Sequence, residues 1–176
     1  KRRKPQCRRK IQEKTDVAIE KRGRKEKERT NMEPYLHHVQ YYETDRMGIT
    51  HHSNYIRWME EARVAFLEEL GWGYEKLENM GIVSPVTQAA CEFKKPTTFS
   101  DVVEITVEVR EYRGVRLLLS YRMVNERTKE LVAEGTSGHC FLNREGQVMI
   151  LKKEHPEFDK ILKELAQAGP AENKDR

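Results

Sequence analysis

The sequence predicts an α+β domain in which a curved antiparallel sheet of five strands wraps around one long central helix. Residues 53–70 form the only long helical pattern ahead of the later strand-like segments. Four such segments follow, and the turns between them are short, which implies antiparallel neighbours because parallel strands need long crossover connections. At 176 residues the chain is long enough for one domain with a continuous core.

The first strand is expected over residues 35–42, which are rich in aromatic and β-branched residues. In residues 53–70 apolar side chains recur three and four positions apart, which gives the helix one buried face. These side chains are Tyr55, Ile56, Met59, Ala62, Phe66 and Leu70. We expect Ser53 to be the N-cap and Gly71 to follow the last helical residues.

Four more strands and two shorter helices follow. Residues 102–110 alternate strictly between apolar and polar, so one face of that strand should pack on the core while the other is exposed or paired. The expected strands are residues 82–95, 102–110, 115–125 and 131–142, and the expected helices are residues 72–80 and 155–168.

Positive charge is concentrated at the N-terminus. Residues 1–30 carry fourteen Lys and Arg against five Asp and Glu, whereas the whole chain has a net charge of only +4. We expect residues 1–31 to be a basic, disordered leader, residues 32–168 to be the folded domain and residues 169–176 to be a polar tail. A basic arm suits nucleic acid or an anionic membrane. The leader reads equally well as upstream sequence that is not native, because Met32 resembles an ordinary protein start.

Cysteine and histidine are too sparse and scattered for a structural framework. The three cysteines are far apart, and no His, Cys or Asp spacing resembles a metal site, so we expect neither disulfides nor a metal. No signal peptide or membrane-length apolar run is present. These features favour a cytoplasmic protein. For the basic leader, we expect no nucleic-acid partner.

Residues 41–55 carry the strongest functional signal. They place Asp45 in a turn that contains Gly48, directly ahead of the start of the long helix. A carboxylate there faces backbone N–H groups that have no partner in the helix, at the positive end of the helix dipole. That arrangement suits chemistry on a carbonyl, because one group can attack or activate water while another stabilises the oxyanion.

The motif over residues 45–55 resembles that of the hotdog-fold acyl-CoA thioesterases. The Asp, the Gly three positions on, the His seven on and the Tyr ten on all match, and residues 59–63 and 93–96 are also similar to the family. The resemblance covers roughly residues 35–151. It is closest to the 4-hydroxybenzoyl-CoA thioesterase branch, which includes the Tol–Pal-associated, YbgC-like acyl-CoA thioesterases.

This resemblance implies hydrolysis of an acyl-CoA to a free carboxylic acid and coenzyme A, without a cofactor. Asp45 would be the catalytic carboxylate, acting as a general base or as a nucleophile. The backbone N–H at or near His52 would polarise the thioester carbonyl, and the His52 imidazole is a second candidate participant. The family also implies a homodimer whose sheets join edge to edge, or a homotetramer, with active sites at the subunit interface.

Five further residues are candidates for substrate binding. Gly48 would permit the tight turn, and Asn54 and Tyr55 would pack or orient the site. Cations near strand ends would meet the phosphates of coenzyme A. The cations are Lys94 and Arg116, with Lys95 and Arg113 as further possibilities.

Three alternatives remain open. Asp45 is also an ordinary turn residue, and Arg46 and Met47 stand where the family commonly has small residues. Other hotdog branches carry the acid on the central helix, so Glu60 or Glu61 is a rival unless both lie on a solvated face. A function of another class is a non-catalytic acyl-CoA-binding or interaction module whose basic arm holds nucleic acid or membrane.

Overall fold

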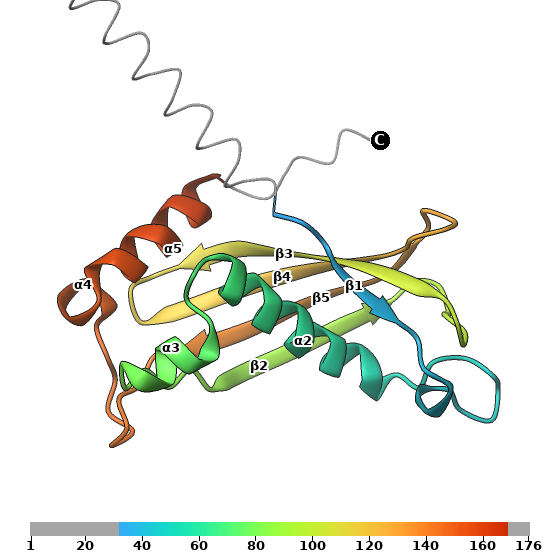
Figure 1. Cartoon of the computed structure of the whole chain (residues 1–176), viewed down its shortest axis with the longest axis horizontal. Coiled ribbons are helices and arrows are strands. Elements are labelled where there is room, and N and C mark those ends of the chain that lie inside the picture. The colour runs from blue at the N-terminus through green and yellow to red at the C-terminus, as the bar shows by residue number, and fades with distance from the viewer. Residues whose placement is uncertain (1–31, 169–176) are drawn as a thin grey trace, which may run out of the picture. The chain divides into compact units, whose positions relative to one another are not determined.

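Five antiparallel strands form one sheet in the order β1-β3-β4-β5-β2 (Figure 1). The computed structural model describes residues 32–168, so the predictions for residues 1–31 and 169–176 lie outside the described residues. The strands are β1 (Tyr35–His38), β2 (Val86–Phe93), β3 (Val102–Tyr112), β4 (Arg116–Asn125) and β5 (Leu131–Cys140). The predicted α+β hotdog architecture is confirmed.

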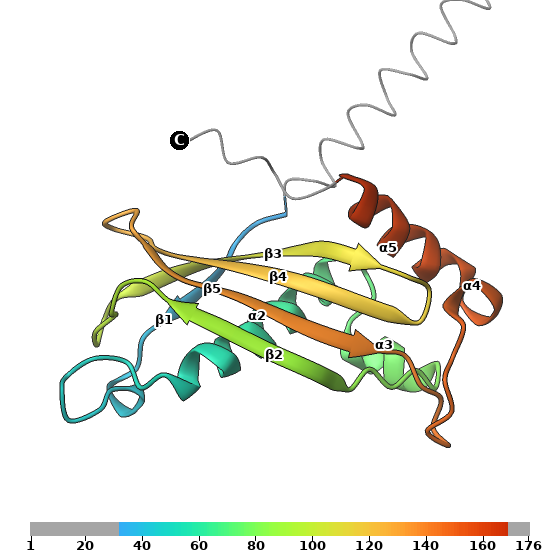
Figure 2. The same ribbon diagram turned by 180° about the vertical axis from the view of Figure 1, so that it is seen from behind.

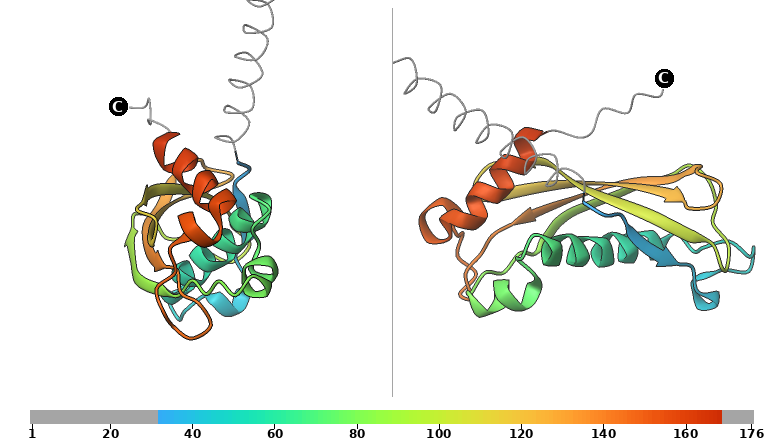
Figure 3. Two further views of the ribbon diagram at one scale, coloured as in Figure 1. Left: turned by 90° about the vertical axis from the view of Figure 1, so that its left-hand side faces the viewer. Right: turned by 45° about the horizontal axis from the view of Figure 1, so that its top comes forward.

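Helix α2 (Ser53–Glu69) lies along the concave face of the sheet (Figures 1 and 3). Its apolar stripe, which includes Trp58 and Phe66, is buried, and the helix contacts β1, β2 and β3. From behind, the strands lie in front of the helix, so the outer face of the sheet is not covered by α2 (Figure 2). The sheet therefore has one apolar face that packs on α2 and one face that does not.

The sequence predicted the C-terminal end of α2 correctly but not its N-cap. Gly71 has a φ of +73° and ends the helix as expected, with the Trp72 amide donating to the Leu67 carbonyl at 2.8 Å. The prediction that Ser53 is the N-cap is wrong. The N-cap is His52, which has helical backbone angles, and the Ser53 hydroxyl lies 2.8 Å from Nδ1 of His51 instead.

A glycine allows α2 to approach the sheet closely. A Cβ atom on Gly135 of β5 would lie 2.7 Å from Sδ of Met59 and 3.2 Å from the Ala90 carbonyl oxygen. The first distance is shorter than real Cβ atoms show and the second is tighter than most, so a side chain at position 135 would require Met59 to shift. Met59 is 2% exposed and fills the space that the missing side chain leaves.

Short helices complete the fold at the end of the sheet where β3 ends. They are α3 (Tyr74–Asn79), α4 (Leu151–Glu154) and α5 (Pro156–Ala168). Phe158 of α5 stacks on Trp72 with ring centroids 4.5 Å apart, and Asp159 accepts a hydrogen bond of 2.9 Å from the Tyr112 hydroxyl. These contacts attach α5 to β3 and to the chain that leaves α2.

The first two strands are shorter than the sequence predicted. β1 ends at His38, and residues Tyr41–Glu43 form a single 3-10 turn, η1, rather than continuing the strand. β2 begins only at Val86, after Pro85. Within residues 32–168 no helix has the length and apolar character needed to cross a membrane.

Candidate active site

Asp45 lies in a tight turn that its own carboxylate helps to form. Oδ1 of Asp45 accepts a hydrogen bond of 2.7 Å from the Met47 amide, and the Gly48 amide donates to the Asp45 carbonyl at 2.9 Å. Gly48 has a φ of +77°, which side chains other than glycine rarely adopt. The Asp45 amide donates back to the Ile49 carbonyl at 2.9 Å, which closes the turn. Glycine at position 48 is therefore explained by the backbone.

The second carboxylate oxygen of Asp45 is available for chemistry. The residue is half-buried, and among residues 32–168 no group donates a hydrogen bond to Oδ2 or pairs with it. One oxygen therefore fixes the orientation of the carboxylate while the other stays free to act as a base or nucleophile.

The turn leads directly into the N-terminus of α2. The amide of His51 donates to the Glu43 carbonyl at 2.8 Å, and the amide of Asn54 donates to the His51 carbonyl at 3.0 Å. Within the part of the chain that the structure describes, the amide of His52 between them has no acceptor. An unpaired N–H at this end of a helix can bind a developing oxyanion.

A buried cluster of hydroxyl groups ties the turn to the segment between β2 and β3. Oγ1 of Thr97 lies 2.7 Å from Oγ1 of Thr50 and 3.0 Å from the Tyr55 hydroxyl. The amide of Thr50 also donates to the Thr97 carbonyl at 2.8 Å. Burial raises the pKa of Tyr55, and the bonds to Thr97 oppose this only in part, so the phenol is neutral at physiological pH.

The aromatic side chains at the helix start surround the same region. Phe93, the last residue of β2, is half exposed and makes edge contacts with Tyr55 at 5.1 Å and His52 at 6.5 Å between ring centroids. The exposed His52 ring also lies 4.2 Å from that of His51. The structure thus brings His52 and Tyr55 together at Phe93, and the turn that holds Asp45 and Gly48 leads into the same end of α2.

The predicted cations do not all converge on this site. Lys94 follows Phe93, but its ammonium group lies 2.6 Å from Glu92 and 3.7 Å from Glu134, and the hydrogen bond to Glu92 raises the Lys94 pKa. Arg116 begins β4 opposite Cys140, whereas the other end of β4 pairs with the start of β3 near the turn. Arg116 and Asp45 therefore lie at opposite ends of the sheet within this chain.

The two rival acids on the helix have different environments. The Glu60 carboxylate is well exposed and lies 3.9 Å from the Arg63 guanidinium, as expected for a solvated helix face. Glu61 instead lies 3.0 Å from Nδ1 of His37 on β1. Neither of these glutamates lies in the turn that carries Asp45.

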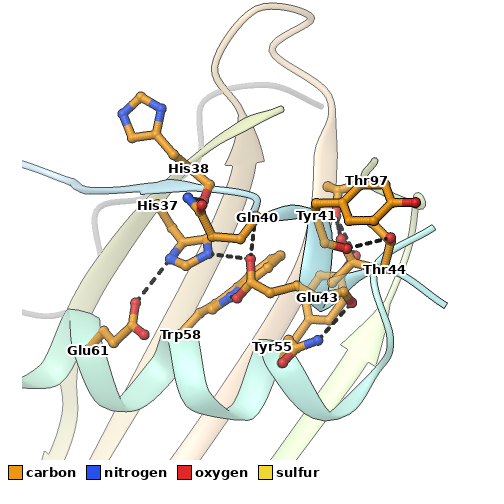
Figure 4. A network of polar contacts seen from close by, with 12 residues as sticks. His37, His38, Gln40, Tyr41, Glu43, Thr44, Tyr55, Trp58, Glu61 and Thr97 are labelled. Carbon is orange, nitrogen blue, oxygen red and sulfur yellow. Dashed lines mark hydrogen bonds and ion pairs between the residues drawn. The ribbon is translucent and has the colours of Figure 1, made fainter. Parts of the chain in front are cut away.

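Sequence reasoning missed a polar network beneath the turn, in which Glu43 is bonded to His37 and Trp58 (Figure 4). The available signal was the alternation within residues 35–38, which sends His37 inward and His38 outward. Within residues 32–168 no group of three or more His, Cys, Asp or Glu side chains is arranged to hold a metal ion.

Comparison with known proteins identifies the family. The profile of the Thioesterase-like superfamily matches residues 39–168. The chain belongs to this family. A proposed esterase of Aquifex aeolicus (strain VF5) is 38% identical over 120 residues, which cover 68% of this chain and 91% of that protein. The proposed acyl-CoA thioesterase YneP of Bacillus subtilis (strain 168) is 35% identical over 107 residues, covering 61% of this chain and 77% of YneP.

A solved structure gives the same result for the fold. The DHNA-CoA thioesterase of Staphylococcus aureus superposes with a TM-score of 0.72 and 28% identity, covering 77% of this chain and 91% of that protein. The predicted membership of the hotdog-fold, YbgC-like thioesterases is confirmed. The protein is a thioester hydrolase.

Proposed function

We propose that this thioesterase hydrolyses acyl-CoA to a free carboxylic acid and coenzyme A, with Asp45 as the reacting carboxylate. The observation that carries the proposal is the arrangement of the turn. One carboxylate oxygen of Asp45 is held by the Met47 amide and the other is free, seven residues before an unpaired helix N-terminal N–H. The names of relatives such as YneP support coenzyme A as the thiol.

The chemistry follows from these two groups. The His52 amide binds the carbonyl oxygen and stabilises the negative charge that develops on it, a contribution of about 2.7–4 kcal/mol for one such donor. The free oxygen of Asp45 either removes a proton from the attacking water or attacks the carbonyl carbon to form an anhydride that water then cleaves. Both routes release coenzyme A and require an ionised carboxylate.

The exposed edge of the sheet supports a homodimer. β2 is one of the two edge strands, and seven of its eight residues are exposed, including Val86 at 48% and Phe93 at 50%. A long apolar edge invites pairing with another chain. In the proposed dimer the β2 strands of two copies pair edge to edge, and the interface lies beside Phe93 and the candidate site.

This pairing gives Arg116 a role that it lacks within one protomer. A two-fold axis perpendicular to the sheet runs the two β2 strands antiparallel, so the Val86 end of one copy lies beside the Phe93 end of the other. Val86 pairs with His139 of β5, one residue from Cys140, which pairs with Arg116. We therefore assign Arg116 to the phosphates of the coenzyme A bound at the site of the second copy, with Lys94 as the local cation.

Thiol release from a panel of acyl-CoA substrates tests the proposal. Asp45→Asn should keep acyl-CoA binding and lose nearly all turnover. Glu60→Gln, the matched control on α2, should keep wild-type turnover. Wild-type turnover by Asp45→Asn would overturn the assignment. Binding without turnover by the wild type would favour the non-catalytic module.

Three experiments test the remaining parts. Sedimentation velocity should give a dimer or a larger even assembly, and a fully active monomer would contradict the edge pairing. Arg116→Ala should raise KM for acyl-CoA while kcat stays unchanged. A chain that begins at Met32 should keep full activity, because the proposed site uses none of residues 1–31.

A further inference from the structure

Glu43 is a buried carboxylate two residues before Asp45. Its side chain is only 5% exposed and accepts three hydrogen bonds. Oε1 accepts from the Trp58 indole at 2.7 Å, and Oε2 accepts from the Gln40 amide at 2.7 Å and lies 2.9 Å from Nε2 of His37. Burial raises the pKa of Glu43, but these hydrogen bonds outweigh it and hold the pKa below its ordinary value. Glu43 is therefore ionised at neutral pH.

His37 links this carboxylate to helix α2. Its Nε2 faces Glu43, and its Nδ1 lies 3.0 Å from Oε2 of Glu61 (Figure 4). Each ring nitrogen of His37 therefore lies within hydrogen-bond distance of one carboxylate, and the ring bridges Glu43 and Glu61. The Tyr35 hydroxyl also donates to Glu61 at 3.1 Å, and burial followed by the charge of Glu61 raises the Tyr35 pKa to about 12.

The main chain of Glu43 holds the other side of the turn. Its carbonyl oxygen accepts one hydrogen bond from the His51 amide and one from Nδ2 of Asn54, both at 2.8 Å. These two donors stand at the end of the turn and in the first turn of α2. A single residue thus connects β1, the start of the turn, its end and the helix.

We infer that Glu43 is a positioning residue that fixes the turn carrying Asp45 relative to the N-terminus of α2. The inference rests on the proposed function, because it matters for turnover only if Asp45 and the His52 amide act on the same carbonyl. Trp58 and Glu61 are one turn apart on α2, so the network ties the turn to a rigid element. Displacing a reacting group by about 1 Å can slow a reaction by about 100-fold.

The network is distinct from the acid–base machinery itself. Both oxygens of Glu43 are occupied, and its side chain is enclosed by His37, Gln40 and Trp58. Glu43 therefore orients Asp45 without touching the substrate. Loss of its charge should lower kcat and leave KM nearly unchanged, since substrate contacts are retained.

The experiment compares Glu43→Gln with the wild-type chain and with His38→Gln. Glutamine keeps the shape of Glu43 but places an NH2 group against donors that need an acceptor. His38 is the exposed neighbour of His37, and its side chain points away from the network (Figure 4), so His38→Gln is the matched control. Two readouts are needed: steady-state thiol release and hydrogen exchange of the amides in residues 44–51.

We expect Glu43→Gln to lower kcat by about ten- to a hundred-fold with KM within about twofold. The hydrogen-bonded amides of Asp45, Gly48 and His51 should exchange at least about tenfold faster. His38→Gln should change neither readout. If Glu43→Gln does not fold, Trp58→Phe removes one donor and should give smaller changes of the same kind.

Two results would overturn the inference. One is unchanged exchange across residues 44–51 in folded Glu43→Gln, whatever its kinetics. The other is faster exchange with wild-type kcat, which would leave Glu43 a purely structural role. If the wild type cleaves no acyl-CoA, the proposed function fails, while the exchange measurement still decides whether Glu43 fixes the turn.

Discussion

The hydroxyl of Ser137 lies 2.7 Å from Nε2 of His139 inside the core, and the hydroxyl of Tyr121 lies 2.7 Å from Ser137 on the other side. The charge of the nearby Arg63 acts on both Tyr121 and His139. Nδ1 of His139 has no hydrogen-bond partner among the described residues.

Stability should fall as the pH drops below the ordinary histidine range, because His139 must stay neutral in the folded state. Burial, followed by the charge of Arg63, lowers the His139 pKa to about 4, against about 6.5 when unfolded. Between these two pKa values the unfolded state binds more protons than the folded state. The free energy of unfolding therefore decreases by up to about 3 kcal/mol as the pH falls from 6.5 towards 4. Urea unfolding at a series of pH values measures this loss.

The variant His139→Gln isolates that contribution. Glutamine can still accept from Ser137 but does not titrate, so the dependence of its unfolding free energy on pH should flatten between pH 4 and 6.5. The quantity to compare is the slope of the unfolding free energy against pH, not the absolute stability of the variant. Equal slopes for the variant and the wild type would show that another group dominates this range.

Protonation of Glu43 is expected to cause a second loss of stability at lower pH. Its pKa is depressed in the folded state, so its contribution is complete above the unfolded value of about 4.5 and is lost as the pH falls through the lower, folded value. Glu43→Gln should be less stable than the wild type at pH 7 and should approach it at pH 3. Parallel curves over pH 3–7 would contradict an ionised Glu43.

Much of the fold could be predicted because its signals are periodic. The apolar stripe in residues 53–70 and the apolar–polar alternation in residues 102–110 are each supported by many residues. Helix α2 and strand β3 accordingly begin and end close to the predicted positions. The N-cap was wrong because capping depends on a single side chain. Ser53 bonds to His51, and the helix begins without a side-chain cap.

The candidate site could be predicted only where it is contiguous in sequence. Asp45, Gly48 and His52 belong to one motif, whereas the contact between His37 and Glu43 depends on where β1 ends and η1 begins. Arg116 was predicted for the site, but its position relative to Asp45 could not be predicted from the sequence. A basic residue at a strand end can lie at either end of the sheet, and only the pairing register decides which.

The hydroxyl of Thr97 should contribute to both stability and turnover. It is fully buried and bonds to Thr50 and Tyr55, so Thr97→Val leaves two buried hydroxyl groups without this partner. We expect a loss of about 1–3 kcal/mol in urea unfolding and slower thiol release, because the turn loses its side-chain hydrogen bond to the segment before β3 and keeps only the backbone contacts. Thr106→Val, on the outer face of β3, should cost less than about 0.5 kcal/mol. A Thr97→Val variant as stable and active as the wild type would exclude this role.

Gly135 and Met59 should be energetically coupled. An added Cβ at position 135 would lie 2.7 Å from Sδ of Met59, so Gly135→Ala should destabilise by about 1–3 kcal/mol through overpacking. Gly138→Ala is the control on the same strand, because its nearest contact would be a rotatable Thr87 hydroxyl at 3.1 Å. In the background of Met59→Ala the Gly135→Ala substitution should cost less, since the shortened side chain leaves room for the new methyl group. Urea unfolding of the four proteins in this double-mutant cycle measures the coupling. Additive free energies would mean that the approach of α2 to β5 is not limited by this contact.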